Sequence, residues 1–156
     1  MKLKCYHLVG VPATGKSTWV KSQTIFKEGE FTVVSSDKFI DDHAEKEGKT
    51  YNGVFNDYAP IAMRLMENHA LIAQANNLNI FWDQTNVSVK SRKKKFDLLP
   101  NYEHIAVVFP IPDKDEHDRR LASRPGKSIP DNVMRSMMDN FQMPTTDEGY
   151  TQIVVL

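Results

Sequence analysis

Short apolar stretches alternate along the chain with longer stretches in which apolar residues recur at helical spacing. The short stretches predict β-strands, and the longer ones predict amphipathic helices. Strands that alternate with helices are typical of a parallel sheet with helices on its faces. We therefore predict an α/β fold with a five-stranded parallel sheet, whose strands cover residues 5–11, 31–37, 78–83, 104–110 and 151–156.

Helices are expected between these strands. The longest is predicted near residues 55–76, where an apolar stripe should face the sheet. The residues of this stripe are Tyr58, Ile61, Ala62, Leu65 and Ile72. The other predicted helices lie near residues 18–26, 89–99, 115–124 and 131–141.

Polar segments follow the first three predicted strands. The segments are GVPATGKST after the first strand, SSD after the second and DQTN after the third. In an open parallel sheet, ligands bind at the carboxyl ends of the strands. We therefore expect these three segments to converge on one site.

Composition indicates one domain without a strong electrostatic field. The 156 residues are about one domain's length, so we expect a single P-loop domain over residues 1–156. Twenty basic and twenty acidic residues give a net charge of zero, so an anionic substrate must be held by a local patch. Cys5 has no cysteine to pair with, and no apolar run approaches a membrane span. We expect a cytoplasmic protein with no membrane association and no obligate protein partner.

The stretch from Gly10 to Thr18 fits the phosphate-loop pattern Gly-x4-Gly-Lys-Ser. Backbone N–H groups of such a loop wrap the β- and γ-phosphates at a helix N-terminus. Lys16 would neutralise phosphate charge, and the Ser17 hydroxyl would bind Mg²⁺, which prefers oxygen ligands. ATP and Mg²⁺ are the expected cofactors. The expected nucleotide-binding residues of the loop are Gly10, Pro12, Ala13, Thr14, Gly15, Lys16, Ser17 and Thr18.

Asp37 follows the second strand and precedes a further predicted helix. One interpretation is a helix N-cap, because Ser, Asp and Asn are favoured there. Phe39 and Ile40 stand where a capping box would need Glu or Gln. The other interpretation is a general base that accepts the proton of an attacking hydroxyl during phosphoryl transfer. The neighbouring phosphate loop favours the general base.

Asp83 ends the third strand. An acidic residue here would orient Mg²⁺-bound water or hydrogen-bond the region of Ser17. The alternative is a turn or cap residue before the next helix. Thr85 and Asn86 fit ordinary capping chemistry.

Arg120 and Arg124 are four residues apart and share one face of a predicted helix, whereas Arg119 and Arg120 point in different directions. We expect the pair to reach over the γ-phosphate and to stabilise charge in the transition state. The segment PGKSIP, residues 125–130, would end the helix and form a mobile flap. The alternative is a solvated charged helix.

Residues 90–95, KSRKKK, form the only dense basic run. This run is either an exposed helix face or a contact surface for a polynucleotide backbone. Nearby Phe96, Trp82 and Tyr51 would either stack on a base or belong to the core.

Together these motifs resemble the polynucleotide 5′-hydroxyl kinases, which include bacteriophage enzymes and the kinase half of animal polynucleotide kinase phosphatases. GVPATGKSTW resembles the family's Gly-x-Pro-x-x-Gly-Lys-Ser-Thr loop, and SSD stands where the family carries its catalytic aspartate. DQTN, RRLASRPGKSIPDNVMRSM and FQMPTTDEGYTQIVVL resemble its later segments. The resemblance spans nearly the whole chain.

The resemblance implies a P-loop kinase fold with an Arg-bearing lid. It implies that Lys16 and Ser17 contact ATP and Mg²⁺ and that Asp37 is the general base. It also implies that Arg120 and Arg124 are lid residues on the phosphates.

One position departs from the phage pattern. The phage enzymes have an arginine three residues after the aspartate, where it holds the acceptor's phosphate, and here that residue is Ile40. Lys38 is a candidate substitute.

The predicted reaction is ATP-dependent phosphoryl transfer to a 5′-hydroxyl end of DNA or RNA. A kinase of a small metabolite, nucleoside or modified base is the main alternative, favoured by the neutral charge and by Ile40. A nucleotide-binding module without transfer activity is the third.

Overall fold

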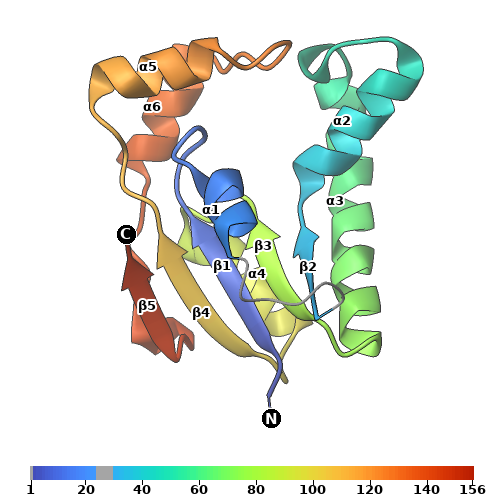
Figure 1. Cartoon of the computed structure of the whole chain (residues 1–156), viewed down its shortest axis with the longest axis vertical. Helices are drawn as coiled ribbons and strands as arrows, with labels where there is room; N and C mark the ends of the chain where they lie inside the picture. The colour runs from blue at the N-terminus through green and yellow to red at the C-terminus, as the bar shows by residue number, and fades with distance from the viewer. Residues whose placement is uncertain (1, 24–29) are drawn as a thin grey trace.

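A parallel sheet of five strands forms the centre of the molecule (Figure 1). The computed structural model describes residues 2–23 and 30–156. The strand order is β2-β3-β1-β4-β5, and each neighbouring pair is parallel. The strands are β1 (Lys4–Val9), β2 (Phe31–Val34), β3 (Asn79–Asp83), β4 (Glu103–Val108) and β5 (Gln152–Val155). The predicted α/β fold is confirmed.

Helices connect the strands. Those formed by the described residues are α1 (Lys16–Ser22), α2 (Ser36–Glu47), α3 (Tyr51–Ala75), α4 (Val89–Leu98), α5 (Lys114–Ala122), α6 (Asp131–Asp139) and the short 3-10 helix η1 (Thr146–Glu148). Helix α1 begins directly after Gly15, which takes a left-handed conformation (φ 95°) that glycine tolerates best. The last residues predicted for this helix, 24–26, lie outside the described residues.

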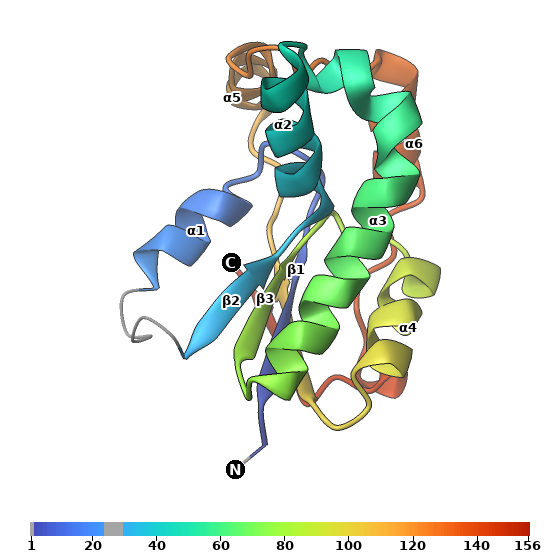
Figure 2. The same cartoon turned by 90° about the vertical axis from the view of Figure 1, so that its right-hand side faces the viewer.

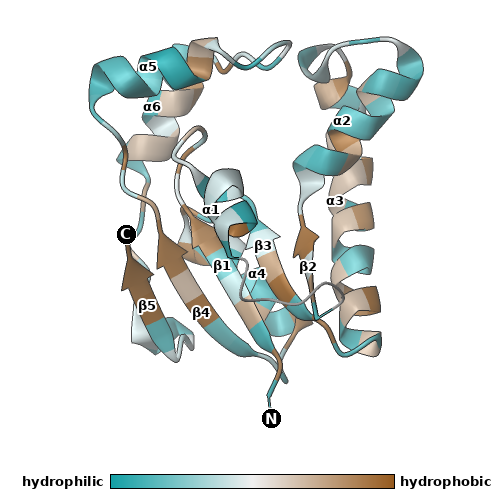
Figure 3. Ribbon diagram, in the orientation of Figure 1, coloured by the Kyte–Doolittle hydropathy of each residue, from teal (hydrophilic) through white to brown (hydrophobic). Residues whose placement is uncertain are grey.

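Alternate side chains of the central strands point to opposite faces of the sheet. Cys5 and Trp82 pack with Met66 of α3 on one face, and Leu8 and Phe81 face α1 on the other. Figure 2 shows the sheet close to edge-on, with α1 on one side and α3 and α4 on the other. The strands are largely hydrophobic, whereas α2 and α5, beyond their carboxyl ends, are hydrophilic (Figure 3).

Helix α3 buries a different stripe from the one predicted. Its buried residues are Val54, Ala62, Met66, Ala70 and Ala73. Ala62 was part of the predicted stripe, but Ile61 and Ile72 are 39% and 59% exposed, so the prediction was wrong at both isoleucines. Small side chains let α3 lie close to its neighbours, and a hydropathy pattern does not show where that close approach occurs. No described helix combines the length and apolar character needed to cross a membrane.

The basic run on α4 is not one exposed surface. Arg92 is fully buried and Lys95 is 5% exposed. The Lys95 Nζ donates to the Ser91 carbonyl oxygen at 3.1 Å and lies 5.2 Å from the centroid of the Trp82 ring. Burial lowers the Lys95 pKa to about 8. The lysines of the run that are exposed are Lys90, Lys93 and Lys94.

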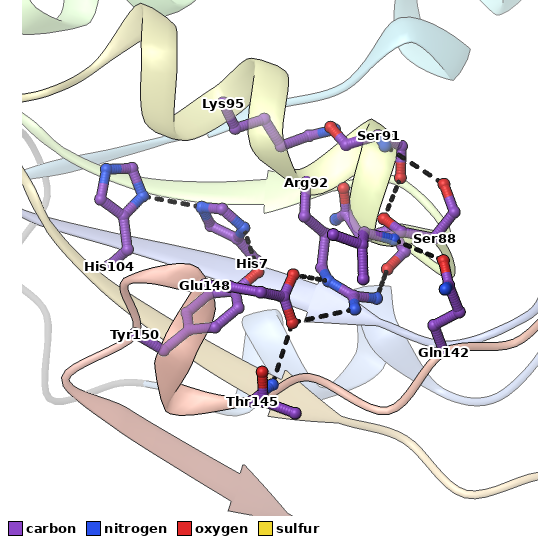
Figure 4. A network of polar contacts seen from close by, with 12 residues as sticks. His7, Ser88, Ser91, Arg92, Lys95, His104, Gln142, Thr145, Glu148 and Tyr150 are labelled. Atoms are coloured by element: carbon purple, nitrogen blue, oxygen red, sulfur yellow. Dashed lines mark hydrogen bonds and ion pairs between the residues drawn. The ribbon is translucent and has the colours of Figure 1, made fainter.

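A buried polar network ties the C-terminal segment to the sheet (Figure 4). His7 Nε2 and His104 Nδ1 are hydrogen-bonded at 2.8 Å, and the Tyr150 hydroxyl donates to His7 Nδ1 at 2.7 Å. Phe96 packs against His104 and Tyr150, with ring centroids 4.3 and 4.8 Å apart. Phe96 thus belongs to the core, as does Trp82, which is 1% exposed.

Candidate active site

The loop between β1 and α1 has tight backbone constraints. A Cβ on Gly10 would lie 2.9 Å from Thr14 Oγ1 and 3.0 Å from Phe109 Cβ, so a larger residue does not fit there. Ala13 (φ 63°) and Gly15 (φ 95°) are both left-handed. These turns carry the loop into the N-terminus of α1, where backbone N–H groups and the helix dipole favour an anion.

Lys16 turns back over this loop. Its Nζ donates to the Gly10 carbonyl oxygen at 2.7 Å and to the Val11 carbonyl oxygen at 2.9 Å. Burial lowers the Lys16 pKa to about 8, although Asp83 and Asp37 act in the opposite direction. An ammonium whose hydrogen bonds go to neutral carbonyls gains a stronger acceptor when an anion arrives. Lys16 is therefore suited to binding phosphate oxygens.

Ser17 and Asp83 are brought together across α1 and β3. Ser17 Oγ donates to Asp83 Oδ2 at 3.2 Å. Burial raises the Asp83 pKa, while Lys16 lowers it. Helix α4 is capped by Ser88, so the interpretation of Asp83 as its cap is wrong. Two adjacent oxygen donors fit a hard cation such as Mg²⁺.

A cleft of about 1550 Å³ lies at the carboxyl ends of the strands. Its walls are the phosphate loop, α2, and α5 with the segment that follows it (Figure 1). Asp83, the last residue of β3, completes the cleft together with residues that follow β2 and β3, such as Asp37 and Gln84. The three polar segments of the sequence therefore meet at one edge of the sheet.

Asp37 lies in the first turn of α2 and lines this cleft. The N-cap of α2 is Ser35, so the interpretation of Asp37 as an N-cap is wrong. The Tyr51 hydroxyl, from the start of α3, donates to Asp37 Oδ1 at 2.6 Å. Asp37 is exposed to solvent in the cleft, which leaves its carboxylate accessible to a substrate hydroxyl.

Ile40 belongs to the packing between α2 and α3. It is 2% exposed and packs with Ala44, Val54 and Ala62. An arginine here would bury a charge in an apolar cluster, which is costly. Lys38, the candidate substitute, is exposed and lines the cleft.

Arg119, Arg120 and Arg124 all line the cleft. Arg120 Nε donates to Glu116 Oε1 at 2.8 Å, and Arg119 Nη2 donates to the same oxygen at 2.7 Å. The side chains of adjacent arginines thus reach one carboxylate, although the sequence predicted different directions for them. Arg124 differs, because its buried Nη1 has no hydrogen-bond partner among the described residues. An unsatisfied buried donor gains much from an anionic acceptor.

The segment after α5 reaches the corner between α2 and α3. The Lys127 Nζ forms an ion pair with Asp41 Oδ2 at 2.7 Å. The Asn52 backbone N–H donates to the Gly126 carbonyl oxygen at 3.1 Å, and its side-chain amide donates to Ser128 Oγ at 2.6 Å. The cleft is thereby bridged from the α5 side to the α2 side.

Sequence reasoning missed several of these residues. Asp41 stands four residues after Asp37, a spacing that puts both on one face of α2 and could have revealed it. Lys127 lies within the predicted flap, but nothing local connects it to Asp41. The buried His117 ring Nε2 donates to the Pro12 carbonyl oxygen at 2.8 Å, which ties α5 to the phosphate loop. These contacts depend on the tertiary fold.

A second cluster of ligand-type atoms lies within the core. Cys5, His7 and His104 have their ligand atoms within 4.8 Å of one another. The His104 Nε2 must donate to the Leu99 carbonyl oxygen, 2.8 Å away, so its Nδ1 accepts from His7 Nε2 and His7 Nδ1 accepts from Tyr150. Both imidazoles therefore use both nitrogens in hydrogen bonds. Burial raises the Cys5 pKa and disfavours the thiolate, so the cluster is structural.

A family comparison matches most of the chain. The model of the AAA domain family matches residues 6–144. The chain belongs to this family. The matched region includes the phosphate loop, Asp37 and Asp83 of the cleft and the arginines of α5, so this AAA domain is a kinase-like P-loop domain.

A curated relative of this AAA domain is the bifunctional polynucleotide phosphatase/kinase of Schizosaccharomyces pombe. The two are 26% identical over 151 residues, which cover 94% of this chain and 31% of the relative. The chain therefore spans about a third of that relative's length. The resemblance to polynucleotide kinases that the motifs indicated is confirmed.

Solved structures share the fold. A chain of the Pnkp1/Rnl/Hen1 RNA repair complex has a TM-score of 0.68 and 20% identity, with 89% of this chain and 44% of that chain covered. A candidate kinase from Chloroflexus aurantiacus j-10-fl has a TM-score of 0.72 and 17% identity, with coverages of 100% and 88%. A gluconokinase from Sinorhizobium meliloti 1021 has a TM-score of 0.55 and 14% identity, with coverages of 98% and 81%. The predicted P-loop kinase fold is confirmed.

Proposed function

We propose that this AAA domain transfers the γ-phosphoryl group of ATP to a 5′-hydroxyl end of DNA or RNA. The observation that carries the proposal is the position of Asp37, which lines the same cleft as Lys16 and Ser17. A module that only binds nucleotides needs no carboxylate opposite its phosphate loop. The acceptor class is supported by the match to a polynucleotide phosphatase/kinase.

In the proposed reaction, the acceptor hydroxyl oxygen bonds to the γ-phosphorus. The bond between that phosphorus and the bridging oxygen to the β-phosphate breaks, and ADP leaves with its electron pair. The hydroxyl proton passes to the Asp37 carboxylate, which later releases it to solvent. Most of the rate comes from positioning and electrostatics.

The phosphate loop, from Gly10 to Thr18, would hold the nucleotide through backbone N–H groups and Lys16. Ser17 and Asp83 are the residues that would hold Mg²⁺. When bound, Mg²⁺ neutralises charge on the β- and γ-phosphate oxygens.

The α5 side of the cleft would act as the lid. Arg124 is suited to bind the γ-phosphate, because its Nη1 has no partner among the described residues. Arg120 is held by Glu116, so it would contact phosphate only by sharing or leaving that carboxylate.

A small-molecule kinase is the second candidate. The phage enzymes hold an acceptor phosphate with an arginine at the position of Ile40. Here that position is a buried apolar residue, so the cleft lacks this arginine. The fold is also shared by a gluconokinase. This candidate uses the same phosphate loop and Asp37 with a different acceptor.

Label transfer from γ-labelled ATP tests the proposal. The acceptors are matched 5′-hydroxyl and 5′-phosphorylated oligonucleotides of DNA and RNA, together with nucleosides and gluconate. We expect label only on the 5′-hydroxyl oligonucleotides. Label on a small molecule would support the second candidate, and ATP binding without any labelled product would support a module without transfer activity.

ATP affinity is expected to fall as pH rises above 8. Lys16 has a pKa of about 8 without nucleotide and binds phosphate as the ammonium, so deprotonation competes with binding. By linkage, the dissociation constant should rise about tenfold between pH 7 and pH 9, as measured by calorimetric titration. A Lys16→Arg variant, whose charge does not titrate there, should show no such change. A wild-type constant that is flat over this range would contradict the prediction.

Asp83→Asn is expected to raise the Mg²⁺ concentration needed for half-maximal transfer by about tenfold. The amide keeps the size of the side chain but removes the anionic oxygen beside Ser17. The measurement is a Mg²⁺ titration at saturating ATP. Asp147→Asn, on η1, removes a carboxylate outside the cleft and should leave the Mg²⁺ requirement unchanged.

A further inference from the structure

Tyr51 joins Asp37 to the segment that follows α5. Its hydroxyl donates to Asp37 Oδ1 at 2.6 Å, and the Lys127 Nζ lies 4.8 Å from the centroid of its ring. Tyr51 is not among the described residues that line the cleft. Its contact with the candidate base is this one hydrogen bond to Asp37 Oδ1.

The hydrogen bond to Tyr51 defines the orientation of an otherwise exposed side chain. It occupies Asp37 Oδ1, whereas Oδ2 has no hydrogen-bond partner within residues 2–23 and 30–156. Burial and the hydrogen bond to Asp37 raise the Tyr51 pKa, so the phenol stays protonated and remains a donor. One carboxylate oxygen is thus held while the other is available to receive a proton.

The ring of Tyr51 lies where the α5 side docks. Lys127 also forms an ion pair with Asp41 at 2.7 Å, and the backbone N–H of Asn52, next to Tyr51, donates to the Gly126 carbonyl oxygen. The docking is close, because a Cβ on Gly126 would lie 3.0 Å from Thr50 Cβ. A docked Lys127 restrains the ring, and the ring places the hydroxyl.

We propose that Tyr51 is a positioning residue that couples docking of residues 124–128 to the alignment of Asp37. This inference rests on the proposed role of Asp37 as general base. It predicts that the two ends of the side chain have separable effects. Loss of the hydroxyl should impair proton acceptance, whereas loss of the ring should also release the docked segment.

Two substitutions separate these effects. Tyr51→Phe keeps the ring over which Lys127 lies and removes the hydrogen bond, so kcat for label transfer should fall about tenfold with the KM for ATP unchanged. Tyr51→Leu removes the ring and the hydrogen bond. Its kcat should therefore fall at least as far, and the docking of residues 124–128 should weaken. Tyr58→Phe removes a hydroxyl elsewhere on α3 and is the matched control. It should change neither kcat nor the docking of residues 124–128.

Trypsin reports on docking independently of catalysis. It cleaves after Lys127, whereas Arg124 is followed by proline and resists cleavage. Cleavage after Lys127 should be unchanged in Tyr51→Phe and about two- to fivefold faster in Tyr51→Leu, since a cation–π contact is lost. Thermal unfolding of each variant verifies that it is folded under the assay conditions.

The outcomes separate this inference from the proposed function. Wild-type transfer together with unchanged kcat in Tyr51→Phe would overturn the alignment of Asp37 by Tyr51. Unchanged cleavage in Tyr51→Leu would overturn the coupling. If the wild-type domain labels no acceptor, the proposed function fails and the inference fails with it.

Discussion

Asp37→Asn is expected to lower kcat for phosphoryl transfer by about 10³-fold while ATP still binds. The amide has nearly the shape of the carboxylate, and its oxygen can still accept the 2.6 Å hydrogen bond from Tyr51. It cannot take the proton of the attacking hydroxyl. Single-turnover label transfer measures the rate, and calorimetric titration measures ATP affinity.

ATP affinity should be unchanged or slightly higher, because the substitution removes a negative charge from the cleft. Glu45→Gln is the matched control, since Glu45 is an exposed carboxylate of the same helix that does not line the cleft. Its kcat should stay within twofold of wild type. An Asp37→Asn variant that keeps more than a tenth of the wild-type kcat would contradict the role of Asp37 as general base.

Glu148→Gln is expected to lower the free energy of unfolding by about 3 kcal/mol, because it leaves a buried guanidinium without its anion. Arg92 is fully buried, and its Nε and Nη2 donate to Glu148 Oε1 and Oε2 at 2.9 and 3.1 Å (Figure 4). Glu148 Oε2 also accepts from the Thr145 backbone N–H at 2.9 Å. For a chain of this size, the melting temperature should fall by roughly 6 to 12 °C.

An exposed ion pair on α4, one residue after Arg92, provides the comparison with the buried pair. Lys93 and Asp97 form an ion pair of 2.8 Å, but their side chains are 71% and 64% exposed. Lys93→Gln should therefore change the free energy of unfolding by no more than about 0.5 kcal/mol. Chemical denaturation of both variants checks the prediction. Equal effects of Glu148→Gln and Lys93→Gln would contradict the importance of burial.

The elements and the phosphate loop could be predicted because their causes are local. A strand or helix follows from the spacing of apolar residues over one short segment, and all five predicted strands are present. The loop needs glycine where the backbone is left-handed or closely packed, as at Gly15 and Gly10. The convergence of the three polar segments follows from parallel pairing of the strands.

Burial within the helices was less predictable. Ile61 and Ile72 are exposed although they are apolar, while Arg92 and Lys95 are buried although they are charged. For the two charged residues, the outcome depends on a partner elsewhere in the sequence. Arg92 is buried because Glu148 can neutralise it, and Lys95 lies over Trp82.

The amino-acid sequence by itself determined the parallel α/β architecture, the phosphate loop and the pair of aspartates at the strand ends, because each arises from residues adjacent in the chain. Only the tertiary structure decided how the cleft is completed. Tyr51 lies 14 residues from Asp37, and Lys127 lies 86 residues from Asp41, yet each pair is in direct contact. Such contacts depend on how α2, α3 and α5 pack around the sheet, and no local pattern specifies that packing.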